Sequence, residues 1–220
     1  MKKFCVMMCG VVCCAMLFAG CSGSGEQEGK ETKADETKAA RSAGEMTETG
    51  FVAETIIIDD FDGGAKPNKL GGDLGAWDRD PNDQTQTCQM TYDSSVKNGE
   101  SGFSIRLDYD VESPNPAYNG FWTKLENLNA SKHKNLVMWV KGDGEKGFTE
   151  KFKVELKSAK ETGVYTVTGV NDTWQKIVIP LERFAGLTDR SALTELVIVF
   201  DDTTSTERFG SINLDDMYFE

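Results

Sequence analysis

From Thr55 onward, apolar and polar residues alternate with a period of two, and turn-forming residues recur at short intervals. Within residues 103–109, Phe103, Ile105, Leu107 and Tyr109 alternate with polar residues, and residues 152–156 alternate in the same way. This pattern is typical of a strand with one buried face, and it does not fit the 3.6-residue period of a helix. The alternation therefore predicts a domain built from strands.

Two other segments, residues 136–140 and 196–200, are continuously apolar, as expected for central strands covered on both faces. Glycine and asparagine turns lie between the strand segments, which number about ten or eleven. No long amphipathic helix is present, and residues 182–194 have room for one short helical turn. Many strands with short turns predict an all-β fold, a two-sheet β-sandwich of jelly-roll type.

The first and last strand segments resemble each other. Ile56, Ile57 and Ile58 are followed at once by two aspartates, and the closing segment, residues 211–219, also contains an aspartate pair, Asp215 and Asp216. We expect the two segments to lie side by side. In the closing segment the apolar residues change parity at the aspartate pair, which predicts a β-bulge there.

The N-terminus has the features of an export signal. Lys2 and Lys3 precede an apolar run over residues 4–20, and Phe18, Ala19 and Gly20 precede Cys21. This arrangement resembles a bacterial lipoprotein signal, which implies cleavage before Cys21 and lipidation of that cysteine. A transmembrane anchor is the alternative, although the run is marginal for a membrane span.

We therefore divide the chain into a signal peptide (residues 1–20), a flexible acidic linker (21–54) and a sandwich domain (55–220). The linker is rich in Glu, Lys, Thr, Ala and Gly, and such a composition cannot bury enough apolar surface to offset the entropy of ordering. The expected location is the cell envelope, where the lipid on Cys21 anchors a domain outside the cytoplasm to a bacterial membrane.

Cysteines and charge exclude several classes of site. Of the 6 cysteines, only Cys88 lies after residue 21, so the domain has no internal disulfide and no multi-thiolate zinc site. Cys88 is expected to be a small buried residue. The formal charge of −12 argues against nucleic-acid binding, which requires a basic patch.

Nothing in the sequence specifies an active site. His133 is the only histidine and is expected to be solvent-exposed, so the common nucleophilic triads are absent. A glycosidase needs two carboxylates, but no pair among the many acids is singled out. We therefore expect no enzyme. Trp139 and Trp174, inside or at the start of apolar segments, are expected to pack in the core.

Five motifs follow one another along residues 55–220. In chain order they are DDFD, NKLGGDLGAW, LVMWVKGDG, DTWQKIVIPLERFAG and INLDDMYF. Together they resemble galactose-binding-like jelly rolls, and among these the family 11 carbohydrate-binding modules and the complex I intermediate-associated (CIA-type) domains. The resemblance implies a β-sandwich that often carries a structural calcium ion and can bind a glucan chain along a concave sheet face.

The acids at the two ends of the domain are the candidate calcium ligands. Calcium takes several oxygen ligands, which irregular segments can supply. Asp62 and Asp215 are the first candidates, with Asp60 and Asp216 as further ones. Asp62 stands where the related domains usually carry a glutamate, which has a longer reach. The alternative is a bulge with solvated carboxylates.

A neutral oligosaccharide or polysaccharide is the expected ligand, because the C–H faces of sugar rings stack on exposed aromatics while planar polar groups bind the hydroxyls. The candidate ligand-binding residues are Trp77, Tyr92, Arg106, Asp108, Tyr118, Trp122 and Tyr165. A protein-interaction or assembly module of CIA type is the alternative. An exposed aromatic row on a concave sheet would favour the sugar, whereas a flat apolar patch would favour a protein partner.

Overall fold

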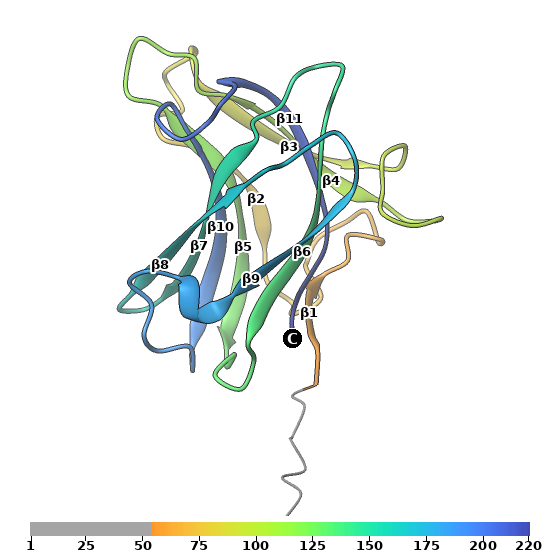
Figure 1. The fold of residues 1–220 in the computed structure, drawn as a ribbon, viewed down its shortest axis with the longest axis vertical. Helices are drawn as coiled ribbons and strands as arrows, with labels where there is room; N and C mark the ends of the chain where they lie inside the picture. The colour runs from red at the N-terminus through yellow and green to blue at the C-terminus, as the bar shows by residue number, and fades with distance from the viewer. Residues whose placement is uncertain (1–53) are drawn as a thin grey trace, which may run out of the picture. The chain divides into compact units, whose positions relative to one another are not determined.

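The computed structural model describes residues 54–220, in which eleven strands form two antiparallel sheets that pack face to face (Figure 1). The strands are β1 (Ile56–Asp59), β2 (Leu74–Asp78), β3 (Thr87–Asp93), β4 (Ser104–Asp110), β5 (Tyr118–Leu128), β6 (Asn135–Gly142), β7 (Lys151–Ser158), β8 (Thr162–Thr168), β9 (Gln175–Pro180), β10 (Leu193–Asp201) and β11 (Phe209–Phe219). The predicted all-β sandwich is confirmed. The signal, the linker up to residue 53 and Cys21 lie outside the described residues.

The six-stranded sheet, called sheet A, has the order β3-β4-β11-β6-β9, and β1 also pairs with β11. The five-stranded sheet, called sheet B, has the order β2-β5-β10-β7-β8. Within residues 54–220 the only helical segment is a single 3-10 turn, Leu181–Arg183, at the start of the region where a short turn was expected. No helix in this part of the chain is long and apolar enough to cross a membrane.

The predicted pairing of the two ends of the domain is confirmed. β1 runs antiparallel to the end of β11, where Ile56 lies opposite Phe219 and Ile57 opposite Tyr218. The predicted bulge is confirmed as well, because the register between β11 and β6 shifts between Asp215 and Tyr218. Asp216 has a φ of 43°, which marks the extra residue of the bulge.

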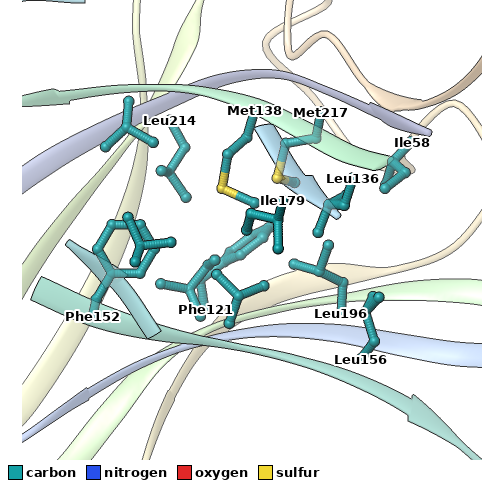
Figure 2. Close-up of a cluster of buried hydrophobic side chains, with 14 of the residues drawn as sticks. Ile58, Phe121, Leu136, Met138, Phe152, Leu156, Ile179, Leu196, Leu214 and Met217 are labelled. Carbon is teal, nitrogen blue, oxygen red and sulfur yellow. The ribbon is translucent and has the colours of Figure 1, made fainter. Parts of the chain in front are cut away.

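The core lies between the two sheets, where alternate side chains of facing strands meet (Figure 2). Sheet A contributes Leu136 and Met138 of β6, Ile179 of β9, and Leu214 and Met217 of β11, all fully buried. Sheet B contributes Phe121, Phe152, Leu156 and Leu196 from the opposite side. Cys88 is a free, buried cysteine, as expected for a small apolar residue.

Three predictions about burial were wrong. Trp139 is only half-buried, because its cross-strand neighbours Asp215 and Lys176 place it on the outer face of sheet A. Trp174 precedes β9 and is also half-buried, outside the core. His133, expected to be exposed, is 8% exposed, and its Nε2 lies 2.8 Å from the carbonyl oxygen of Glu54. The histidine loop therefore folds against the start of the domain.

Candidate functional site

The outer face of sheet B carries a hollow of about 460 Å³ in which three of the predicted aromatic residues meet. Trp77 comes from β2, and Tyr118 and Trp122 come from β5. Because β2 pairs with β5 and Trp77 lies opposite Gly120, the three side chains project from the same face. We call this hollow the aromatic cleft.

The floor of the aromatic cleft is apolar. Val197 of β10 lies opposite Trp122, and Val199 lies opposite Gly120. Both valines line the hollow and are buried, although they belong to the outer face of the sheet. β10 is thus covered on both faces, by the core inside and by the cleft side chains outside.

Two glycines lie beside the aromatic rings. Trp122 lies over Gly75 of β2, where a Cβ atom would be 3.5 Å from the indole ring. Gly120 has a φ of 156°, and a Cβ atom there would clash with the carbonyl oxygen of Ile198. The ring centroids of Trp77 and Tyr118 are 5.8 Å apart with a tilt of 59° between the planes. The aromatic row therefore follows β2 and β5.

Charged side chains line the other side of the cleft in balanced pairs. Lys157 Nζ lies 3.4 Å from Glu155 Oε2 and 3.4 Å from Glu195 Oε1, and Lys124 also pairs with Glu195. The Lys124 ammonium lies 5.3 Å from the centroid of the Trp122 ring. The cleft therefore presents both donors and acceptors next to the aromatic row, without a net charge from these four residues.

Tyr92 and Tyr165 lie elsewhere. Tyr92 of β3 is opposite Ile105, and Tyr165 of β8 is opposite Val154, so both rings lie on the inner sides of their sheets beside core residues. Burial raises the pKa of Tyr92, and the charge of Asp59 raises it further. The structure does not bring either ring into the aromatic cleft.

Arg106 and Asp108 lie on the outer face of sheet A, on the opposite side of the sandwich from the cleft. They are bound to their neighbours: Arg106 Nε is 3.1 Å from Asp108 Oδ1, and Arg106 Nη2 is 2.8 Å from Asp143 Oδ2. Burial would raise the pKa of Asp108, but a hydrogen bond from Lys146 and the charge of Arg106 lower it on balance. One ligand in the cleft cannot contact this pair.

The acids proposed for calcium gather loosely around the bulge. Asp215 is 2% exposed, and burial together with the charges of Asp216 and Asp62 raises its pKa to about 7. Asn98 donates to both members of the pair, from its backbone nitrogen to Asp215 (2.8 Å) and from its side chain to Asp216 (2.8 Å). Asp60 forms an ion pair instead, in which its Oδ1 lies 3.0 Å from Lys69 Nζ.

Within residues 54–220, no group of three or more His, Cys, Asp or Glu side chains is arranged to hold a metal ion. A calcium ion beside Asp62 and Asp215 would therefore need backbone carbonyl or water oxygens to complete its shell. A cation beside the buried carboxylate of Asp215 would stabilise its ionised form.

Several residues of the cleft were missed by the sequence analysis. They are the valines of the floor and the four charged residues: Lys124, Glu155, Lys157, Glu195, Val197 and Val199. For Lys124 a signal was present, because Tyr118, Trp122 and Lys124 share one parity in the same strand. The residues of β7 and β10 could not be found in this way, since their position beside β5 depends on the sheet order.

Comparisons with known proteins agree with the β-sandwich fold. The sequence model of the carbohydrate binding domain (family 11) matches residues 46–195. No curated protein matches the chain in sequence.

Solved structures share the fold. The family 11 module of the cellulosomal cellulase Lic26A-Cel5E of Clostridium thermocellum superposes with a TM-score of 0.56 at 17% identity, covering 76% of this chain and 95% of that one. A family 11 module of the same organism, in complex with a beta-1,3-1,4-mixed-linked tetrasaccharide, gives 0.56 at 16% identity and covers 75% and 94%. An exo-beta-agarase gives 0.52 at 10% identity, covering 74% of this chain and 25% of that one.

Proposed function

Because the chain belongs to the family 11 carbohydrate-binding domains, we propose that its sandwich binds a neutral oligosaccharide or polysaccharide in the aromatic cleft of sheet B. The observation that carries the proposal is the meeting of Trp77, Tyr118 and Trp122 over an apolar floor in one hollow. The family 11 module in complex with a beta-1,3-1,4-mixed-linked tetrasaccharide supports a glucan-like ligand.

The chemistry of the cleft fits a sugar chain. The C–H faces of sugar rings can stack on Trp77, Tyr118 and Trp122, and Tyr118 is 42% exposed and thus open to such contact. The ring hydroxyls both donate and accept hydrogen bonds, so they can pair with the ammonium of Lys124 and the carboxylate of Glu155. The balanced charges favour a neutral sugar over an anionic one.

In this proposal the domain binds and does not catalyse. The carboxylates that line the cleft, Glu155 and Glu195, are held in ion pairs with Lys157 and Lys124. A glycosidase would need one of its two carboxyl groups to be protonated as the acid. Both carboxylates of the cleft are instead engaged by lysine side chains.

The proposal includes a membrane tether. Lipidation of Cys21 would anchor the chain, and the linker up to residue 54 would hold the domain away from the membrane. The domain would then hold a glycan at the surface of the cell envelope. A protein partner is the alternative. It would be sought on the outer face of sheet A, where the apolar residues Ile57, Tyr218, Val137 and Val178 form one row across four strands.

Calorimetry of single variants tests the cleft. Trp122→Ala and Tyr118→Ala should each weaken the binding of neutral oligosaccharides by roughly 2- to 13-fold, which corresponds to the ~0.5–1.5 kcal/mol of an aromatic contact. Trp139→Ala is the matched control, because Trp139 is also half-buried but faces outward from sheet A.

The control should bind as tightly as the wild type. If the wild type gives no heat with mixed-linkage glucan, cellulose or xylan oligosaccharides, the sugar proposal fails. If Trp139→Ala weakens binding as much as Trp122→Ala does, the ligand does not occupy the aromatic cleft.

A further inference from the structure

A second hollow, of about 330 Å³, lies beyond Tyr118 at the end of the aromatic cleft. It is lined by Arg79, Asp80, Asp83, Gln86, Asn115 and Pro116. These residues come from the loop that joins β2 to β3 and from the loop that precedes β5. We call it the loop hollow.

Arg79 and Tyr118 form the wall between the two hollows. The Arg79 backbone nitrogen donates to the carbonyl oxygen of Tyr118 at 3.1 Å, so the pairing of β2 with β5 continues past the end of β2. The Arg79 guanidinium lies 5.1 Å from the centroid of the Tyr118 ring, which lines the aromatic cleft. A sugar chain that extends along the aromatic row from Trp122 to Tyr118 would therefore reach Arg79.

The walls of the loop hollow are held in place by Asp83. Its carboxylate accepts hydrogen bonds from Gln86 Nε2 (2.9 Å), Asn115 Nδ2 (3.1 Å) and Thr85 Oγ1 (2.6 Å). The hydrogen bond from Thr85, the largest effect, and the one from Gln86 lower the pKa of Asp83 well below its usual range. Because these neighbours use both of its oxygens, Asp83 organises the hollow and leaves ligand contacts to other groups.

Gln86 supplies an observation independent of the hollow's shape. Its side chain lines the hollow and is 3% exposed, yet its Oε1 atom has no hydrogen-bond partner. A buried acceptor without a partner is costly, and native proteins rarely leave one unsatisfied. A hydroxyl group that entered the hollow could donate to this oxygen.

We infer that the loop hollow is an end subsite for the sugar chain bound in the aromatic cleft. Arg79 would donate to hydroxyl or ring oxygens, and Gln86 Oε1 and Asn115 Oδ1 would accept from hydroxyls. One arginine faces Asp80 and Asp83 around the hollow, so an anionic sugar is disfavoured and a neutral one fits. The inference rests on the proposed function of the cleft.

An end subsite gives affinity that grows with chain length. A tetrasaccharide and a hexasaccharide from each of mixed-linkage glucan, cellulose and xylan are titrated calorimetrically into the full-length protein. For the glycan that binds, the hexasaccharide should have an affinity about tenfold higher than that of the tetrasaccharide, a difference of ~1.4 kcal/mol in binding free energy. Arg79→Ala and Asn115→Ala should lose most of this gain and keep the affinity for the tetrasaccharide within about twofold.

Arg183→Ala is the matched control, since Arg183 is an exposed arginine in the 3-10 turn and lies outside both hollows. It should keep the full gain with length. If Arg79→Ala binds the tetrasaccharide normally and shows the same increase in affinity with chain length as the wild type, the end subsite is refuted. Binding in the aromatic cleft is not contradicted by that result. A wild type that binds neither length of any of the three glycans would overturn the cleft and the subsite together.

Discussion

Replacement of Asp215 by asparagine should change how the stability of the domain depends on pH. Asp215 lies in the bulge of β11, where burial and the charges of Asp216 and Asp62 raise its pKa to about 7. In the unfolded chain its pKa is near ~3.9. Between these two values the folded state holds a proton that the unfolded state has lost. The free energy of unfolding therefore falls as pH rises through this window, from about 4 to about 7.

The magnitude follows from the size of the shift. A change of about three pKa units at ~1.4 kcal/mol per unit gives an upper limit of roughly 4 kcal/mol between low and neutral pH. Asparagine has nearly the same shape, can still accept from the backbone nitrogen of Asn98 and does not titrate. Asp215→Asn should therefore remove most of this loss. Asp59, whose pKa burial raises to about 6, contributes a slope of the same sign that remains in the variant.

Urea unfolding followed by tryptophan fluorescence, between about pH 4 and pH 8 with a calcium chelator present, measures the effect. The quantity to compare is the change in unfolding free energy across that range, since asparagine also alters the hydrogen bond that Asp216 donates to Asp215. Asp172→Asn, at an exposed aspartate, is the control and should follow the wild type. If Asp215→Asn loses as much stability across this range as the wild type does, the argument from a protonated, buried Asp215 is refuted.

Three further predictions concern calcium, the membrane and the cleft. If calcium binds beside Asp62 and Asp215, a hundredfold excess over its dissociation constant adds about 2.7 kcal/mol to the free energy of unfolding. The melting temperature should therefore fall in chelator and recover with calcium, and Asp62→Ala should abolish this response. Identical melting curves with and without chelator would contradict a calcium site. If Cys21 is lipidated, Cys21→Ser should leave the domain folded but move the protein out of the membrane fraction, and an unchanged fractionation would contradict the tether. Gly120→Ala should destabilise the domain by at least ~2 kcal/mol in urea unfolding, because the new Cβ would clash with the carbonyl oxygen of Ile198, and a variant as stable as the wild type would show that this strand can shift.

Local patterns along the chain were enough to predict the strands and their buried faces. Successive side chains of a strand point to opposite sides, so the alternation at Ile105 and Leu107 specifies a buried face without reference to any other strand. The bulge at Asp215 was predictable for the same reason, because a parity change within one strand needs an extra residue. The pairing of the two ends was predicted from the aspartate pairs that both end strands carry. The sandwich was predicted from the many strands with short turns and from the resemblance of the motifs.

Parity does not tell which strands are neighbours, and this limited the prediction of the site. Trp77, Tyr92, Tyr118, Trp122 and Tyr165 were equivalent candidates in the sequence. The order of sheet B brings three of them together, while Tyr92 and Tyr165 turn toward the core. Arg106 and Asp108 were predicted to be on a polar face, and they are, but that face belongs to the other sheet.

In continuously apolar strands the alternation carries no information about faces, and the tertiary structure alone decided them. Residues 136–140 of β6 are all apolar, so the sequence predicts burial for each of them. Trp139 nevertheless lies on the outer face, because sheet B covers only the side that carries Met138 and Val140. In β10 the outer face bears Val197 and Val199, which became the floor of the aromatic cleft only because β5 and β7 lie on either side. The strands were a local property of the chain, whereas the cleft depends on contacts between strands that are far apart in sequence.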